Sequence, residues 1–564
     1  MNKMIYSNVV VENGIPVLKI NGEKVPENAY VTYFTEKACY SDFAKAGYAL
    51  YSVPIFFATR GIQERNIIPP FADGIYEKEE ADFSIADKAI EQILEACPDA
   101  YIFPRVNITL PLRWEEENPD ELCDTGHADP NKKRPCFSSD KWAEETKKYL
   151  GMFFDHIEKA HYRDRIFGYQ LATGNTEEWF SFDLVGSIGK RSREKFQEYV
   201  EEKQLEATEE LYYAFLSEMT ARRICEFADF TKEKTGHRLV VGSFYGYTFE
   251  TPFRTAVHAA LGTVLASKSI DFLCSPISYM LGREAGIDHP CMLPLDSLKK
   301  HGKLYFVEND SRTHLSGPLF DVPHFYNPVW MSRDKWLTVE NIKLHYARAL
   351  IHAHALWWFD MGGGWYRYPL YMDMFTEFLK ITKEAMNRDM SSVSEVAVIV
   401  DEAVIPFINE ERQEDAKRTC YGIRKVLGLM GTPYDSYLAE DYQDIKDKYK
   451  AFILLVPRMS PAMKQIADEN HNCLVITPQN ASIKTEELRE YCRSRGVHIY
   501  SEKDAVIFVN KSYLFLHTAS VGRAELSIPQ GIELKQRYGE EIDIERTELP
   551  RYTGYLFEVR KKFQ

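Results

Sequence analysis

The sequence predicts an α/β protein that begins with a (β/α)8 barrel, or TIM barrel. Short apolar runs alternate with amphipathic stretches over roughly the first 390 residues, and eight of the runs read as buried strands. The chain is 564 residues long, which is more than one hydrophobic core usually supports. A barrel followed by one or two smaller domains is therefore expected.

The barrel domain is assigned to residues 1–390 and starts with a β-hairpin. The hairpin pairs residues 9–11 with 17–20 through a turn at Asn13-Gly14, and a second turn follows at Asn21-Gly22. The predicted barrel strands cover residues 29–34, 48–57, 100–108, 166–172, 238–244, 270–275, 304–307 and 355–359. The clearest helical spacing between them covers residues 85–96, 141–159, 209–235 and 339–352.

Two further domains are predicted after the barrel. Residues 391–502 follow a polar stretch and alternate strands at 396–400, 451–456 and 473–477 with helices at 418–430 and 461–470. This order predicts a small parallel sheet with helices on both faces. Residues 503–564 alternate apolar and polar positions at 506–509, 513–517, 524–528 and 555–559, which is typical of a small antiparallel β domain.

Composition narrows the possible partners and the cellular compartment. The net charge of −15 disfavours binding to nucleic acid or to an anionic membrane, whereas a neutral or cationic small substrate is acceptable. The first residues lack the pattern of a signal peptide, and no window is as apolar as a membrane helix. The ten cysteines form no CxxC pairs, which is typical of reduced thiols. We therefore expect a soluble, cytoplasmic protein.

One group of residues has the chemistry of a metal site. Cys123, His127 and Cys136 could hold zinc if a fourth ligand came from elsewhere, but their spacing is irregular and no fourth ligand is apparent. Neither a Gly-x-Ser-x-Gly nor a His-Glu-x-x-His motif occurs. We expect no metal and no cofactor.

Carboxylates follow two of the predicted barrel strands, at the end where TIM barrels carry their reactive groups. Glu177 and Glu178 follow the fourth strand, and Glu308 ends the seventh. Cleavage of a glycosidic bond needs one carboxyl that protonates the leaving oxygen and a second that attacks the anomeric carbon. We predict that Glu178 is the acid/base and Glu308 the nucleophile. The alternative is a solvated loop acid at Glu308 and two carboxylates at a helix N-terminus.

Other strand exits supply aromatic and polar side chains that could bind a sugar. Indole faces stack on the C–H faces of pyranosides, although core packing is expected for at least one of Trp357 and Trp358. Arg105 is the preferred partner that would keep Glu308 ionised. The predicted substrate-binding residues are Arg105, Asn107, Trp114, Asn175, Trp179, Asp310, Trp358 and Trp365.

These segments together resemble the family 42 glycoside hydrolases (GH42), which are retaining β-galactosidases. The resemblance rests on residues 81–87, 105–114 with 118–121, 178–179 and 305–308, and, after the barrel, on 396–401, 434–442 and 549–557. It implies a flavodoxin-like second domain that mediates trimers and a small β domain at the end. The family carries its acid/base in an Asn-Glu pair directly after the fourth strand. Here extra residues separate Asn175 from two candidate glutamates, so Glu177 stays an alternative.

The expected function is that of a retaining exo-β-glycosidase acting on small β-linked glycosides, similar to a β-galactosidase. A small carbohydrate is the expected substrate, and a homotrimer is the expected assembly. A β-mannosidase or β-glucosidase of the same architecture is the nearest alternative. A non-catalytic sugar-binding protein on the same fold is a second alternative, since a fold does not guarantee turnover.

Overall fold

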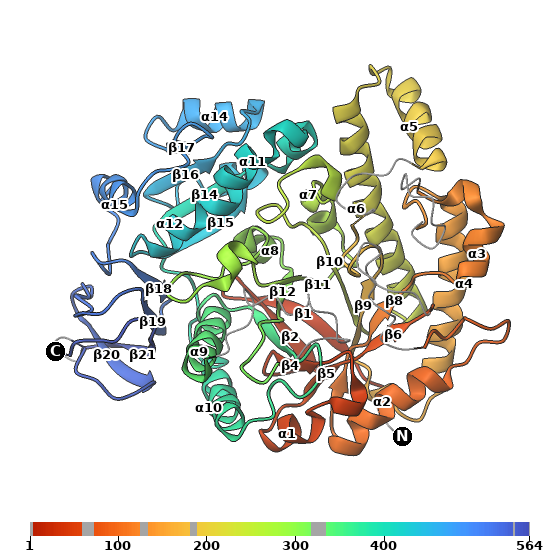
Figure 1. Ribbon diagram of the computed structural model, residues 1–564, viewed down its shortest axis with the longest axis horizontal. Helices are drawn as coiled ribbons and strands as arrows, with labels where there is room; N and C mark the ends of the chain where they lie inside the picture. The colour runs from red at the N-terminus through yellow and green to blue at the C-terminus, as the bar shows by residue number, and fades with distance from the viewer. Residues whose placement is uncertain are drawn as a thin grey trace.

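The computed structural model describes residues 4–58, 73–123, 134–180, 189–316, 334–544 and 547–562. Its largest sheet is parallel, and its segments run in the order β6-β8-β9-β10-β11-β12-β13-β4-β5-β7 (Figure 1). Because β5 and β6 are two parts of one strand, as are β7 and β8, this order closes a barrel of eight strands. The segments are β4 (Asn28–Val31), β5 (Leu50–Ser52), β6 (Pro54–Phe56), β7 (Tyr101–Ile102), β8 (Arg105–Asn107), β9 (Gly168–Ala172), β10 (Val240–Phe244), β11 (Phe272–Pro276), β12 (Leu304–Asn309) and β13 (Ala355–Phe359).

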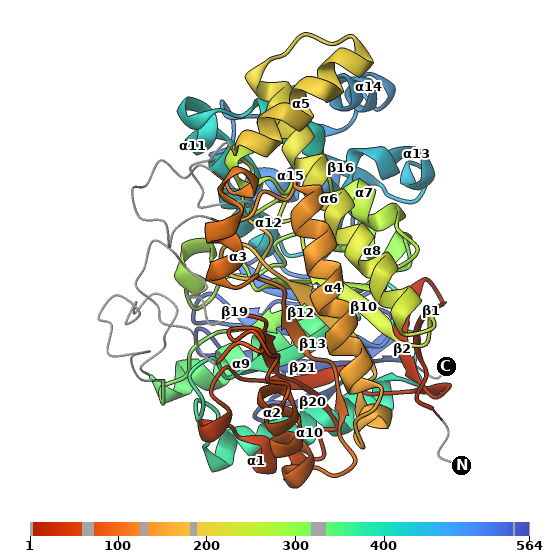
Figure 2. The same ribbon diagram turned by 90° about the vertical axis from the view of Figure 1, so that its right-hand side faces the viewer.

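All eight predicted barrel strands are confirmed, as are the four predicted helices, with ends that differ by a few residues. Side chains of Ser139, Thr208 and Asp334 accept a backbone N–H in the first turn of three helices, which explains where these helices begin. Figure 2 shows α4 and α6 along one side of the barrel. The larger outer helices are α2 (Ser84–Ala96), α4 (Asp140–Ile157), α5 (Lys190–Lys203), α6 (Glu209–Lys234), α9 (Lys335–Ile351) and α10 (Pro369–Ala385).

The predicted N-terminal hairpin is confirmed and covers the end of the barrel opposite the strand exits. It consists of β1 (Ser7–Glu12), β2 (Ile15–Ile20) and the short β3 (Glu23–Lys24). Asn13 and Gly14 have φ angles of 52° and 79°, the left-handed pair that a two-residue hairpin turn requires. The Ser7 N–H donates to the carbonyl that precedes β10, so the hairpin lies at the start of the strands.

The second domain is a four-stranded parallel sheet of flavodoxin-like order, β15-β14-β16-β17. One face of the sheet belongs to the core that it shares with the barrel, and the other face packs a separate cluster that includes Ile399 and Leu454. The helix predicted over residues 418–430 is interrupted by a π-helical turn at Lys417–Gly422. The main elements are β14 (Val396–Val400), α12 (Arg424–Leu429), β15 (Tyr434–Leu438), β16 (Ala451–Leu455), α14 (Pro461–Glu469), β17 (Leu474–Ile476) and α15 (Thr485–Ser494).

The third domain is an antiparallel sheet of order β18-β19-β21-β20. The strand predicted at residues 524–528 is wrong. Glu525 has a φ of 50°, which an extended strand does not allow, and the stretch forms one isolated bridge from Leu526 to Ser501. The edge strand was missed because its side chains are half-exposed on both faces, which gives no clear alternation. The strands are β18 (Ala505–Val509), β19 (Tyr513–Thr518), β20 (Ile532–Tyr538) and β21 (Gly554–Lys561).

The cysteines and the helices bear on two expectations from composition. All ten cysteines are free thiols. In the described part of the chain, no helix combines the length and the apolar character that crossing a membrane demands.

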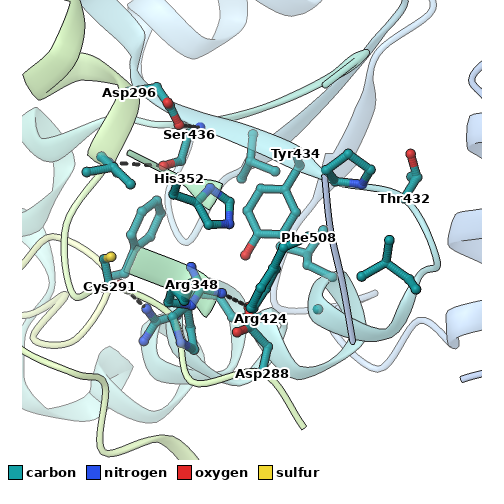
Figure 3. Close-up of a pocket in the computed structure, with 18 of the residues that line it drawn as sticks. Asp288, Cys291, Asp296, Arg348, His352, Arg424, Thr432, Tyr434, Ser436 and Phe508 are labelled. Carbon is teal, nitrogen blue, oxygen red and sulfur yellow. Dashed lines mark hydrogen bonds and ion pairs between the residues drawn. The ribbon is translucent and has the colours of Figure 1, made fainter. Parts of the chain in front are cut away.

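A cavity of about 40 Å³ lies where the three domains meet (Figure 3). Arg348 from α9 pairs with Asp288 of the barrel inside it and lies 4.6 Å from the ring centre of Phe508 in β18. Tyr434 contributes a wall from the second sheet. None of the predicted site residues lines this cavity. It is therefore a feature of the contact between domains and not of the barrel mouth.

The Arg348–Asp288 pair gives a first testable prediction. Both side chains are buried, so Arg348→Met leaves an unpaired carboxylate and is expected to lower the free energy of unfolding by about 3–5 kcal/mol. Chemical denaturation measures the change. The matched control is Lys511→Met, which breaks a half-exposed pair with Asp389 and should cost about 0–1 kcal/mol. Equal, small effects of the two substitutions would contradict a role for Arg348 in holding the domains together.

Candidate active site

Glu308 is the last-but-one residue of β12 and lies inside the barrel at the strand exits. It is 5% exposed and sits beside Trp357 of β13 in the register of the sheet. The Arg105 guanidinium donates from Nη2 to Glu308 Oε2, and Trp357 Nε1 donates to the same oxygen at 3.2 Å. Arg105 is itself fixed by Gln170 Oε1 at 3.1 Å. Glu308 is thus a carboxylate held in one orientation by donors from two other strands of the barrel, β8 and β13.

Two opposing effects set the charge of Glu308. Burial raises the pKa of Glu308 to about 7, and the nearby Asp310 carboxylate acts in the same direction. Arg105 and the Trp357 indole act against this and favour the ionised form. Because an arginine keeps its proton, the Arg105 contact favours an ionised Glu308 near neutral pH.

Glu178 lies after β9 and is half-buried. Its Oε1 accepts a hydrogen bond from Tyr247 OH at 2.7 Å, and its Oε2 accepts from the Thr176 hydroxyl. Burial raises the pKa of Glu178 to about 8; both hydrogen bonds oppose this rise, whereas the charges of Glu308 and Asp310 add to it. Glu178 therefore keeps its proton at neutral pH. The guanidinium contact of Glu308 instead favours loss of the Glu308 proton.

Glu177 occupies a different environment from its neighbour. It has no exposed surface, and its two oxygens accept from Tyr33 OH and from Asn107 Nδ2, the latter at 3.2 Å. Arg105 Nη1 lies 3.7 Å from Glu177 Oε2. These contacts enclose the Glu177 carboxylate, which has no free face toward a leaving group. The geometry therefore favours Glu178 as the acid and gives Glu177 a part in fixing Arg105.

The backbone after β9 explains how two adjacent glutamates reach different surroundings. Thr176, Glu177 and Trp179 all have φ angles near 60°, at 58°, 67° and 61°. Each such non-glycine position costs about 1–3 kcal/mol and is typically found at functional sites. The segment is held by the Trp179 N–H, which donates to the Thr173 carbonyl at 2.8 Å, and by the Glu178 N–H, which donates to the Asn175 carbonyl at 3.3 Å.

Asp310 is bound on two sides directly after β12. Arg283 Nη2 lies 2.6 Å from its Oδ1, and Tyr279 OH donates to its Oδ2 at 2.9 Å. On the next strand, Asp360 accepts from the Trp365 N–H at 2.9 Å and from Tyr30 OH at 2.7 Å. Both aspartates are therefore fixed by protein donors, and Asp360 shapes the loop that carries Trp365.

The predicted tryptophans do not all reach the site. Trp179 and Trp358 are fully buried, with their indole N–H groups bonded to the Leu171 carbonyl at 3.2 Å and to Tyr48 OH at 3.3 Å. Both are core residues and present no free ring face, so they do not serve as sugar platforms. Trp114 lies in the short helix α3 (Leu112–Glu117) and is also part of the main core.

Trp357, rather than Trp358, is the strand-eight indole that contacts a catalytic candidate. Side chains alternate along a strand, and Trp357 pairs in register with Glu308, which places the two side chains on the same side of the sheet. The tyrosines at the site were also missed. Tyr247 and Tyr279 each come three residues after a barrel strand, at the end of the barrel where the acidic candidates also lie.

The possible metal ligands are only partly described. Cys123 and Cys136 lie with their Sγ atoms 3.5 Å apart, and His127 lies outside the described residues. Over the described ranges, no group of three or more His, Cys, Asp or Glu side chains is arranged to hold a metal ion.

Similar folds occur among solved structures of glycoside hydrolases. Gan42B, a GH42 β-galactosidase, matches with a TM-score of 0.63 at 10% identity, over 99% of this chain and 100% of that one. The chain has a GH42-like fold. A β-galactosidase from the Antarctic haloarchaeon Halorubrum lacusprofundi matches at 0.60 and 13% identity, over 94% of this chain and 99% of that one. A GH42 exo-carrageenase from Bacteroides ovatus matches at 0.54 and 12% identity, over 99% and 85%.

The GH42-like fold covers the whole arrangement of a barrel, a flavodoxin-like domain and a β domain. The sequence itself matches no family model and no curated protein. The likeness to the solved structures is thus one of fold.

Proposed function

We propose that this protein is a retaining exo-β-glycosidase that hydrolyses small β-linked glycosides, with Glu308 as nucleophile and Glu178 as acid/base. The observation that supports this proposal most directly is the difference between the environments of the two carboxyl groups. Arg105 and Trp357 donate to Glu308, whereas Glu178 is a half-buried carboxyl whose pKa is raised to about 8. Two carboxyls with opposite charge preferences at one barrel mouth are the requirement of this chemistry. The GH42-like fold supports the same proposal.

The proposed reaction has two steps. In the first, Glu308 attacks the anomeric carbon while Glu178 gives its proton to the leaving oxygen, which forms a covalent glycosyl ester on Glu308 and releases the alcohol. In the second, Glu178 removes a proton from water, the water oxygen attacks the anomeric carbon, and Glu308 leaves as a carboxylate. Tyr247 holds Glu178 in place for both proton transfers. The sugar is released in its original β configuration.

The first experiment is hydrolysis of a panel of 4-nitrophenyl α- and β-glycosides, including galactosides, glucosides and mannosides. We expect one β-glycoside to be cleaved, and the preferred sugar distinguishes a β-galactosidase from a β-mannosidase or β-glucosidase. Glu178→Gln should leave the hydrolysis rate nearly unchanged for glycosides with very acidic leaving groups, because these groups need no proton to leave. It should slow the hydrolysis of glycosides with less acidic leaving groups by about 10²–10⁴-fold. The effect of Glu177→Gln on the hydrolysis rate should not depend on the leaving group. The reverse pattern would make Glu177 the acid.

The pH dependence of kcat/KM is a second test. Glu308 must be ionised, so activity should rise with pH through its pKa of about 7; Glu178 must be protonated, so activity should fall through its pKa of about 8. Tyr247→Phe removes a hydrogen bond that lowers the pKa of Glu178, and the descending limb should therefore move to higher pH. A descending limb that stays in place would exclude Glu178 as the titrating acid.

A non-catalytic sugar-binding protein is the alternative from another class. It predicts binding of a free sugar without hydrolysis of any glycoside in the panel. The buried ion pair between Arg105 and Glu308 argues against this alternative. Binding neutral sugar hydroxyls alone does not require a buried carboxylate that is held by a fixed cation.

The domain boundaries, the assembly and the location are also proposals. We place the domains at residues 1–390, 391–502 and 503–564, and propose a cytoplasmic homotrimer formed through the flavodoxin-like domain. Light scattering on the purified protein measures the assembly, and a mass of one or two chains would contradict the trimer.

A further inference from the structure

Arg312 is a buried cation that forms no ion pair with the side chains that the structure describes. It comes four residues after Glu308, in the segment that leaves β12, and is 5% exposed. Within the described residues its guanidinium takes part in no recorded hydrogen bond or ion pair, and Nη1 is a fully buried donor with no acceptor. Burial lowers the pKa of Arg312, as expected for a charge removed from water.

Other arginines buried to a similar degree are paired. Each of seven contacts a carboxylate oxygen within 4 Å: Arg105, Arg223, Arg254, Arg283, Arg348, Arg424 and Arg489. Another buried arginine, Arg134, donates to the Thr109 hydroxyl. Carboxylate pairing is the expected arrangement, because an unpaired buried charge costs several kcal/mol. Arg312 departs from the arrangement of these seven arginines.

The carboxylate nearest in sequence does not serve as the missing partner. Asp310 already forms an ion pair with Arg283 and accepts a hydrogen bond from Tyr279 OH, and its influence on Arg312 is a through-space attraction. The recorded contact of the Arg312 guanidinium is with the Trp365 ring, whose centre lies 5.7 Å from Cζ. A cation–π contact contributes about 0.5–2 kcal/mol, which is less than the cost of burying the charge.

The surroundings of Arg312 are those of the candidate active site. Arg312 comes two residues after Asp310, which accepts a hydrogen bond from Tyr279 OH at 2.9 Å. The Asp310 charge raises the pKa of both Glu178 and Glu308. The segment that carries Arg312 therefore adjoins the two catalytic candidates.

We propose that the substrate carries an anionic oxygen group, a uronate carboxylate or a sulfate ester, that binds Arg312 in the catalytic pocket. The inference rests on the proposed glycosidase function and names the class of sugar that it acts on. A guanidinium matches the oxygens of either group with two parallel N–H donors. The ring of Trp365 holds the guanidinium from one side. Since the chain has a net charge of −15, an acidic sugar is recognised by this contact and not by long-range attraction.

The test compares matched neutral and acidic substrates. The 4-nitrophenyl β-glucoside and β-galactoside are assayed beside their uronides and their 6-sulfates, with the wild type, Arg312→Gln and Arg367→Gln. Arg367 is an exposed arginine on the strand-eight loop and is the matched control. We expect the wild type to prefer one acidic glycoside by about 100-fold in kcat/KM, since a site built around a polar group rejects the analogue that lacks its partner.

The variants separate this inference from the function on which it rests. Arg312→Gln should abolish the preference, mostly through KM, whereas Arg367→Gln should keep the preference and leave the activity on the neutral glycoside within about threefold. Loss of activity in Arg312→Gln on the uronide alone, or on the 6-sulfate alone, identifies the anionic group that Arg312 binds. Cleavage of neutral glycosides with no acidic preference, unchanged in Arg312→Gln, would overturn the inference and leave the glycosidase intact.

A binding measurement covers the case in which no glycoside is cleaved. Calorimetry with glucuronate, galacturonate and galactose 6-sulfate is carried out on the wild type and on Arg312→Gln. Binding of one of these anions that is at least tenfold weaker in the variant supports the inference even if the proposed hydrolysis fails. Equal binding, or no binding of any of the three, overturns it.

Discussion

Glu308→Gln is expected to lower kcat for the preferred β-glycoside by about 10³-fold or more. The amide cannot form the glycosyl ester, so the variant loses the covalent route and not only one contact of the transition state. Its size is nearly that of the carboxylate, and the Trp357 indole can still donate to the amide oxygen. The fold should therefore persist, and steady-state kinetics with an unchanged circular dichroism spectrum would establish the effect.

The control for this substitution is another buried glutamate. Glu340 lies in α9, is 2% exposed and contacts the third domain through the Gly554 N–H. Glu340→Gln removes a buried negative charge away from the strand exits and is expected to leave kcat unchanged. A comparable loss in both variants would show that buried charge in general, rather than Glu308 in particular, supports the activity.

Arg105→Met is expected to damage both catalysis and stability. It removes the cation that contacts Glu308 and lies 3.7 Å from Glu177, which leaves two buried carboxylates without their counter-charge. Breaking a buried pair in this way costs about 3–5 kcal/mol of unfolding free energy. Because Arg105 lowers the pKa of Glu308, its loss should move the ascending limb of the pH profile to higher pH.

Arg105→Lys distinguishes charge from geometry in the same place. A lysine keeps the positive charge but lacks the fork that also bonds Gln170 through Nε, so activity should fall between that of the wild type and Arg105→Met. The ascending limb should stay near its original pH in the lysine variant. If neither variant shifts this limb, Arg105 does not control the ionisation of Glu308.

Much of the fold could be predicted from local patterns. The Asn13-Gly14 turn and the alternation of strands and helices are short-range signals, and the structure confirms most of the elements that they predict. Residues 524–528 were misjudged because alternation alone does not reveal a left-handed residue such as Glu525. The strand β20 was missed because an edge strand with two half-exposed faces lacks a periodic signal.

The site was harder to predict than the fold, for a geometric reason. Glu177 and Glu178 are equivalent in sequence, and their separation into an enclosed and a half-buried carboxyl depends on left-handed backbone angles at non-glycine residues. Likewise, only the register of β12 against β13 distinguishes Trp357 from Trp358. Arg312 has no ion-pair partner within the described residues because other arginines already pair with the nearby carboxylates. Which arginine pairs with which carboxylate is known only once the barrel is assembled.

The most direct test of the central claim is to trap the glycosyl-enzyme. A 2-deoxy-2-fluoro derivative of the preferred glycoside, with a good leaving group, slows the second step more than the first, so the ester accumulates. Mass spectrometry of the digested protein should then find one fluorinated sugar on the peptide that contains Glu308. A label on the peptide that contains Glu177 and Glu178, or turnover of the preferred glycoside with inversion at the anomeric carbon, would contradict the account.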